Sequence, residues 1–236
     1  MGLPADRDIF ELLPNEGKRK VQSLYQAIRA NVKPGITVHL GGRANAAACE
    51  IIRQFWGTRP AFTVVAVFTV DRYIDLVGAN LVKKLLTANS YEYVPTAGPS
   101  RAVQQAFREK RVEIESWSIL SLTQRLMAGA LDIGFMPTKS IRGSSMARDN
   151  SDFFQEISDP FNPASKIGVV KALSPDISIV HGLAADEAGN TILAPDLFGT
   201  GEAEWGALAS RGGVVVTVEK IVSTDFIRKY SSLVRV

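Results

Sequence analysis

The junction between a short predicted strand and the helix after it contains the residues best suited to bind a ligand. Ile36–Leu40 is β-branched and apolar, Gly41, Gly42 and Arg43 follow, and Ala44–Trp56 has apolar residues at helical spacing. Glycines let the backbone approach a ligand closely, and a helix N-terminus presents unpaired N–H groups. Such a junction can hold a phosphate or stabilise an oxyanion, although a plain packing turn has the same pattern. The third glycine of a dinucleotide fingerprint and the lysine of a phosphate loop are both missing.

A second candidate is the acidic strand predicted over Val112–Trp117. Strand alternation places Glu113, Glu115 and Trp117 on one face. Ligands of open parallel sheets bind at the carboxyl ends of the strands, which makes Glu115 the better placed carboxylate and a candidate catalytic residue. A polar strand face, or a cap for the next helix, is the simpler interpretation of the same pattern.

Two predicted loops add candidate substrate contacts. Gly98 lies in the loop over residues 96–100, and Ser144 lies in the loop over residues 142–146 beside Arg142. Hydroxyl, guanidinium and backbone donors of these loops could contact an anionic group. Solvated turns would have the same composition.

Other residues with chemically reactive side chains are expected to have structural roles. His39, alone inside a strand, is expected to be a hydrogen-bonded core residue rather than a base, and Cys49 a small buried side chain. Trp205 is expected to pack its helix, with Glu202 and Glu204 as solvated charges. Two histidines and one cysteine show no metal-ligand spacing, so no metal site is predicted.

Composition narrows the class of protein. The 236 residues are 46% hydrophobic and 22% charged, with a formal net charge of +3. Basic residues are scattered, so no nucleic-acid footprint is predicted. The longest apolar run, Phe62–Val70, is too short to span a membrane, and Met1–Glu11 does not have the pattern of a signal peptide. With a single cysteine as well, we expect a cytoplasmic protein.

The order of predicted elements indicates an α/β fold with an open, mainly parallel sheet and helices on both faces. Phe62–Thr69 is almost continuously apolar, as in a strand buried on both faces, and Ile74–Leu86 has helical spacing. We expect a helical segment over residues 1–32 and one α/β domain over residues 33–236. Residues 140–165 are polar and rich in turn residues, which predicts a long loop excursion from that domain.

Six segments in order resemble the α subunits of class I coenzyme A transferases, glutaconate CoA-transferase above all. The resemblance covers roughly residues 20–230, and each motif is loose, so its strength lies in the order. The matching segments are Thr37–Gly42, Val112–Ser118, Ala130–Pro137, Ser158–Phe161, Pro175–His181 with Asp186–Asn190, and Val215–Val222. The family's α subunits continue past the point that matches Val236, which predicts a trimmed or absent tail here.

The resemblance implies a fold of the CoA-transferase/isomerase (NagB/RpiA-like) type and a β-type partner subunit. In that family the β subunit usually carries a glutamate that forms an acyl anhydride and then a glutamyl-CoA thioester. Its motif is not recognisable here, so the resemblance assigns the nucleophile to the partner and the oxyanion donors to this chain. Coenzyme A would be a substrate, exchanged between an acyl-CoA and a carboxylic acid, with no permanently bound cofactor.

Two alternatives remain open. Some proteins similar to this family hydrolyse cyclic ketone CoA thioesters in steroid ring degradation, and Glu115 matches the strand glutamate of their α subunits. The same fold type also serves non-catalytic ligand-binding and sensor proteins, because a fold does not by itself assign a function.

Overall fold

The main sheet of the protein is open and mainly parallel. The structure, a computed structural model, describes residues 19–92, 98–194, 200–234 and 236. Within them, seven strands form this sheet in the order β12-β11-β1-β2-β4-β7, with β13 paired to β11, and only β12 runs antiparallel to its neighbour. The strands are β1 Thr37–Leu40, β2 Phe62–Val65, β4 Val82–Thr87, β7 Glu113–Ser116, β11 Ile177–Ala185, β12 Thr191–Leu193 and β13 Val214–Ile221.

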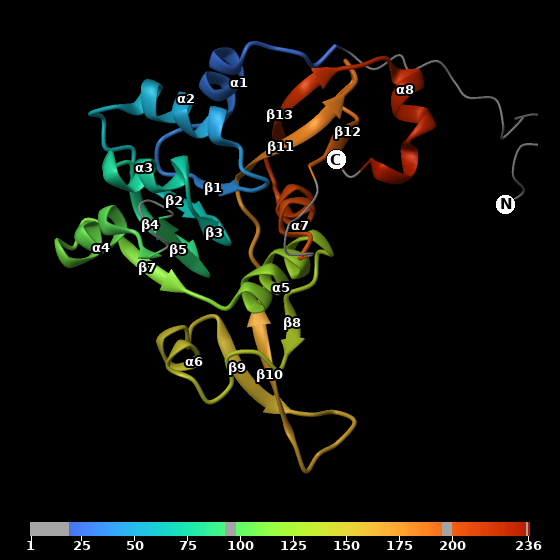
Figure 1. Cartoon of the computed structure of the whole chain (residues 1–236). Coiled ribbons are helices and arrows are strands. Elements are labelled where there is room, and N and C mark those ends of the chain that lie inside the picture. The colour runs from blue at the N-terminus through green and yellow to red at the C-terminus, as the bar shows by residue number, and fades with distance from the viewer. Residues whose placement is uncertain (1–18, 93–97, 195–199, 235) are drawn as a thin grey trace, which may run out of the picture.

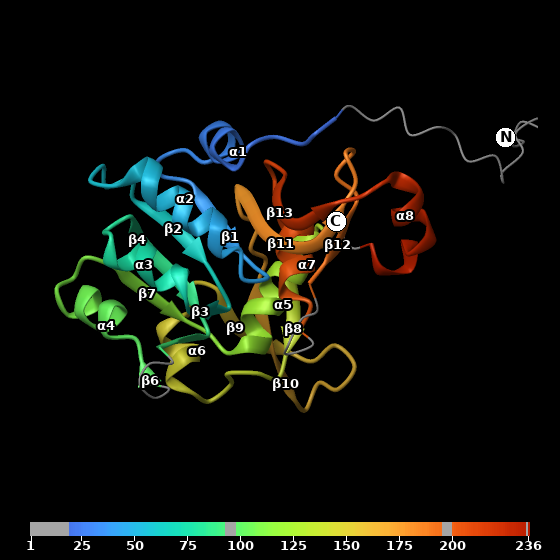
Figure 2. The same ribbon diagram turned by 45° about the horizontal axis from the view of Figure 1, so that its top comes forward.

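Helices cover both faces of this sheet, as Figure 1 and Figure 2 show. In β2, Val64 belongs to the core cluster that contains Ile51 of α2, whereas Val65 belongs to the cluster that contains Leu122 of α5. The expected α/β class and the strand buried on both faces are therefore confirmed. One face carries α1 Leu24–Asn31, α2 Asn45–Phe55, α3 Arg72–Gly78 and α4 Arg101–Arg108; the other carries α5 Ile119–Ala130 and α7 Glu202–Ala209.

One predicted helix is wrong in its second half. The pattern predicted a helix over Ile74–Leu86, but α3 ends at Gly78 and β4 follows in the middle of the sheet. Asn80 adopts a left-handed conformation (φ 58°), which ends the helical path after the glycine. Leu85 and Leu86 then face opposite core clusters. A strand buried on both faces has apolar runs that also fit helical spacing, so the pattern could not separate the two.

The predicted loop over residues 140–165 is wrong in part, because it contains ordered elements. The helix α6 (Ser145–Asp149) and the strand β9 (Phe154–Ser158) lie within it. Strand β9 pairs with β10 (Lys166–Lys171), which pairs in turn with β8 (Phe135–Thr138) in an antiparallel sheet below the main one. Buried Phe154, opposite Val170, gives this sheet an apolar inner face.

Shorter elements complete the fold. A small sheet joins β3 (Phe68–Thr69), β5 (Asn89–Glu92) and β6 (Gly98–Pro99). The chain closes with α8 (Thr224–Lys229) and a short 3₁₀ turn, Ser231–Leu233. Of the predicted helical segment over residues 1–32, residues 1–18 lie outside the described residues, as do residues 93–97 around the predicted loop at 96–100. In the described parts of the chain, no helix has the length and apolarity needed to cross a bilayer.

Helix α7 approaches β1 very closely, because Gly206 has no side chain. A Cβ atom on Gly206 would lie 2.0 Å from Cε1 of the His39 ring. His39 is fully buried, so its imidazole cannot move into solvent to relieve such a contact. Gly206 therefore sets the distance between α7 and the carboxyl end of β1.

We predict that Gly206→Ala destabilises the protein through this contact. Overpacking a tight core costs about 1–3 kcal/mol, which lowers the melting temperature of a chain of this length by roughly 5 °C. The matched control is Gly78→Ala at the end of α3, where the nearest atom to a new Cβ is 3.9 Å away. Equal melting temperatures for the two variants in thermal unfolding would contradict the packing described here.

Candidate active site

The glycine loop, Gly41 to Arg43, leads from the carboxyl end of β1 into α2. Gly41 is buried, whereas Gly42 and Arg43 take left-handed conformations with φ of 60° and 57°. Glycine adopts this conformation without penalty, but a residue with a side chain pays roughly 1–2 kcal/mol. The exposed Arg43 is thus a locally strained residue at the start of a helix, a situation common at functional sites.

The backbone N–H groups of this loop differ in whether they already donate a hydrogen bond within the protein. The N–H of Gly41 donates to the carbonyl of Ile179 at 3.0 Å, so it cannot also donate to a ligand. Across the described residues, no hydrogen bond engages the N–H of Gly42 or of Arg43. Of the three loop residues expected at a ligand site, Gly41 therefore has no spare N–H to offer, whereas Gly42 and Arg43 do.

Tyr73 of α3 braces the loop from one side. Its hydroxyl accepts a hydrogen bond from the N–H of Ala44 at 2.7 Å and donates one to the carbonyl of Gly41 at 3.3 Å. Burial, and secondarily the nearby charge of Glu202, raise the pKa of Tyr73 above its ordinary value. The hydroxyl accordingly stays protonated at neutral pH and keeps its donor role.

A buried polar chain lies on the other side of the loop. Nδ1 of His39 lies 2.8 Å from Oγ of Ser178, and Nε2 lies 3.2 Å from Oε2 of Glu202. His39 and Ser178 are fully buried, and the Glu202 side chain is only 13% exposed. The expectation of a hydrogen-bonded core histidine is confirmed. The expectation that Glu202 is a solvated charge is wrong, since α7 folds it back onto β1.

Glu115 is held by two cations and an indole. Its carboxylate lies 2.6 Å from Nη1 of Arg125 and 2.8 Å from Nζ of Lys84, and it accepts a bond of 2.7 Å from Nε1 of Trp117. Burial alone would raise the pKa of Glu115, but the bonds from Lys84 and Trp117 and the charge of Arg125 outweigh it. The pKa therefore lies below its ordinary value, and the carboxylate is ionised at neutral pH.

This ion-pair network joins the two sheets. The Arg125 guanidinium lies 4.6 Å from the ring centres of both Trp117 and Phe153, and its Nε donates to the carbonyl of Lys171 in β10 at 3.0 Å. Strands β2 and β4 separate β7 from β1, so Glu115 lies three strand spacings, roughly 14 Å, from the glycine-loop strand. The structure does not bring Glu115 to the glycine loop.

The other predicted contacts lie on separate elements. Ser144 is the N-cap of α6, where its hydroxyl accepts from the N–H of Ala147, and the neighbouring Arg142 pairs with Glu156 at 3.2 Å. Gly98 lies in β6, opposite Glu92. Both loops of the sequence prediction thus have local structural roles in this chain.

Trp205 packs against the second core cluster, as expected, whereas Cys49 is half-buried rather than fully buried. Within the described ranges, no three His, Cys, Asp or Glu side chains gather in a way that would hold a metal ion.

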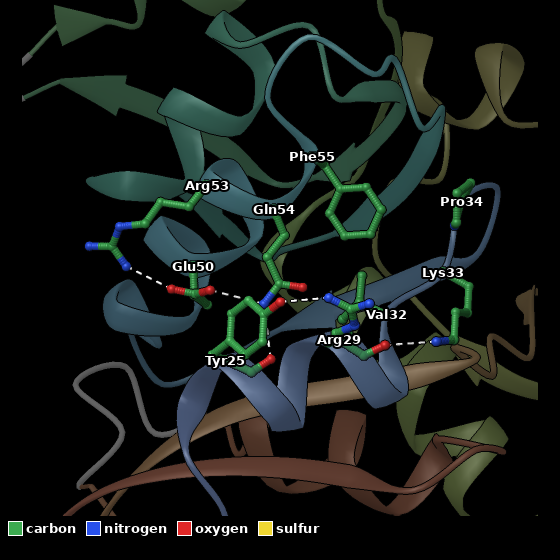
Figure 3. A pocket seen from close by; sticks show the side chains of 9 residues that line it. All are labelled: Tyr25, Arg29, Val32, Lys33, Pro34, Glu50, Arg53, Gln54 and Phe55. Atoms are coloured by element: carbon green, nitrogen blue, oxygen red, sulfur yellow. Dashed lines mark hydrogen bonds and ion pairs between the residues drawn. The ribbon is translucent and has the colours of Figure 1, made fainter.

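Two open hollows flank α2. The larger, about 620 Å³, lies between α1 and the C-terminal part of α2, where Glu50 accepts bonds from Arg53 and Gln54 (Figure 3). Its lining residues on α2 run from Glu50 to Phe55, which places the hollow roughly 8–15 Å along the helix axis from Asn45, the first residue of α2. The second, about 520 Å³, adjoins the first turn of α2 and is lined by Asn45, Ala46, Cys49, Asp71, Arg72 and Asp75. Of the two, only the second borders the loop.

Comparison with known proteins places this fold in a family. A model of the coenzyme A transferase family matches residues 21–233. The A subunit of the 3-oxoadipate CoA-transferase of Pseudomonas knackmussii is 30% identical over 208 residues, covering 85% of this chain and 70% of that protein. An uncharacterised protein of Archaeoglobus fulgidus is 29% identical over 220 residues, which cover 89% of this chain but 46% of that protein. The chain thus spans less than half of the Archaeoglobus relative.

The solved structure of glutaconate CoA-transferase from Acidaminococcus fermentans has the same fold. Its match covers 92% of this chain and 72% of that chain, with a TM-score of 0.78 and 23% identity. In sequence, the A subunit of that enzyme is 26% identical over 232 residues, covering 89% of this chain and 69% of its relative. The family match over nearly the whole described sequence, together with these A subunits, shows that the chain belongs to the coenzyme A transferase family.

Proposed function

We propose that this chain is the A-type subunit of a two-subunit enzyme that moves coenzyme A between an acyl-CoA and a carboxylic acid. A B-type partner supplies the nucleophilic glutamate, and this chain supplies the oxyanion donors and part of the acyl pocket. Coenzyme A is a substrate and no cofactor is permanently bound. A single cysteine fits a reducing compartment, so we place the enzyme in the cytoplasm.

The observation that supports this proposal is the pair of free N–H groups at Gly42 and Arg43. They belong to a loop at the carboxyl end of a central parallel strand, where ligands of such sheets bind. They also precede α2, whose N-terminus adds a positive dipole end. Each well-placed donor to an oxyanion contributes on the order of 3 kcal/mol to transition-state stabilisation.

In the proposed reaction, these donors act on the thioester carbonyl. The partner's carboxylate attacks the acyl carbon, the C–S bond breaks, and coenzyme A leaves as a thiolate. The thiolate then attacks the glutamyl carbonyl of the resulting anhydride, which releases the first carboxylate and leaves a glutamyl thioester. The acceptor acid reverses both steps. The negative oxygen formed at the thioester carbonyl is the charge that Gly42 and Arg43 stabilise.

We predict that the covalent intermediate forms on the partner. The complex is exposed to an acyl-CoA and treated with borohydride or hydroxylamine, and peptide mass spectrometry locates the modified glutamate. A modified glutamate on the partner and none on this chain is expected. Modification of Glu202 or Glu115 would contradict the proposal, because this chain would then carry the nucleophile. This chain alone, carried through the same treatment, is the control.

The hydrolase alternative centres the reaction on Glu115, and substitution of this residue distinguishes the hydrolase from the transferase. Glu115→Gln leaves the buried Arg125 without its counter-charge, which costs about 3–5 kcal/mol and lowers the melting temperature by roughly 10 °C. Glu113→Gln is the matched control, because Glu113 also pairs with Lys84 but is 63% exposed and contributes less than about 1 kcal/mol. A stable Glu115→Gln protein that has lost all turnover would favour the hydrolase.

The ion pairs of Glu115 also predict how stability depends on pH. Its pKa in the folded chain lies below that of the unfolded chain, so it stabilises the fold fully above about pH 4.3. This contribution is lost as the pH falls through the folded pKa. Glu115→Gln should therefore have a flatter acid limb than the wild type when the unfolding free energy is measured from about pH 6 to 3. Parallel acid limbs would show that the carboxylate is not ion-paired in solution.

A further inference from the structure

One carboxylate oxygen of Glu202 has no hydrogen-bond partner in the part of the chain that the structure describes. The carboxylate accepts one hydrogen bond, at Oε2 from Nε2 of His39, and has no other partner among the described residues. The side chain is only 13% exposed. An ionised carboxylate can accept about four hydrogen bonds, and buried polar groups are normally satisfied. This oxygen of Glu202 is not among the fully buried side-chain atoms without a partner, so it can be reached from outside the described chain and can accept from a donor group of a ligand.

The open oxygen belongs to the first turn of α7, which lies directly on the glycine loop. A Cβ atom on Gly41 would lie 3.0 Å from Cα of Ala203, the residue after Glu202. The charge of Glu202 also reaches the hydroxyl of Tyr73, which braces the same loop. A ligand whose carbonyl oxygen rests on Gly42 and Arg43 would therefore pass close to Glu202.

His39 and Ser178 fix the orientation of this carboxylate. A carboxylate oxygen accepts, so Nε2 of His39 is the donor in its contact with Glu202. In the tautomer with its proton on Nε2, Nδ1 accepts from the hydroxyl of Ser178 at 2.8 Å. The close approach of Gly206 leaves the imidazole no room to rotate away. Ser178 is fully buried, so it is a positioning residue rather than a nucleophile.

We propose that Glu202 accepts a hydrogen bond from an amide N–H of the pantetheine arm of the acyl-CoA, with His39 and Ser178 as positioning residues. This inference rests on the proposed function, because it takes the thioester carbonyl to lie at Gly42 and Arg43. In an acyl-CoA, only two methylene groups separate the thioester sulfur from the nearest amide nitrogen. That amide is an uncharged donor, which matches an acceptor-only carboxylate that is mostly shielded from water.

The test compares binding and turnover in the complex with the B-type subunit. Acetyl-CoA is titrated calorimetrically into the wild type, Glu202→Gln and the matched control Glu204→Gln, which removes the same charge from the same helix turn. The amide oxygen that Glu202→Gln introduces can still accept from His39, so the fold should persist. We expect Glu202→Gln to raise the dissociation constant about 10-fold and change kcat less than about threefold, and Glu204→Gln to leave both unchanged. His39→Gln should weaken binding in the wild type but add nothing to Glu202→Gln.

Each other outcome overturns a distinct claim. An unchanged dissociation constant for Glu202→Gln, or an equal loss in Glu204→Gln, refutes the pantetheine contact. Complete loss of kcat with unchanged binding would make Glu202 a catalytic residue instead. If the wild type binds acetyl-CoA but transfers no coenzyme A, the proposed function fails while the binding comparison still decides the role of Glu202. If the wild type does not bind acetyl-CoA, both proposals fail.

Discussion

The hydrogen bond from the Gly41 N–H to the carbonyl of Ile179 is the constraint on which the candidate site depends. It continues the pairing of β1 with β11 by one residue, so the chain leaves the sheet only after Gly41. Two left-handed residues must then turn it into α2, and the N–H groups of Gly42 and Arg43 are left without partners inside the described chain. The free donors are thus a consequence of where the sheet ends. Tyr73 and α7 support the same turn from opposite sides.

Two polar clusters, one around Glu115 and one around Glu202, lie between the main sheet and the helices α5 and α7. The partners of each carboxylate indicate different roles for the two clusters. Both oxygens of Glu115 are bound to cations, and the cluster connects β4, β7, α5 and the small antiparallel sheet. Removing one member leaves a buried charge, which makes the cluster a strong constraint on the relative position of the two sheets. Glu202 differs, since His39 contacts one of its oxygens and no other described residue contacts the second, which lies beside the loop. Both residues are glutamates, so it is the number of partners of each carboxylate that separates their roles. Glu115 is fully paired and suits a structural role, whereas Glu202 has an oxygen that can accept from a ligand.

Sequence patterns predict those elements whose burial shows in the local order of apolar, polar and glycine residues. The continuous apolar run at β2, the glycine pair after β1 and the alternation of Glu115 with Ile114 all correspond to features of the structure. Leu85 and Leu86 were assigned to a helix because a strand buried on both faces has the same apolar spacing. The Glu202–His39 contact joins residues 163 positions apart, so no local signal could show it. Likewise, the bond that uses the Gly41 N–H depends on the register of a strand far along the chain.

The central claim is that Gly42 and Arg43 receive the thioester oxygen, and a crystal structure of the two-subunit complex with an acyl-CoA tests it most directly. The proposal predicts that this oxygen lies about 2.7–3.1 Å from the two backbone nitrogens, with the partner's glutamate facing the acyl carbon. A thioester bound with its oxygen away from the loop, against the Glu115 cluster of β7, would contradict it.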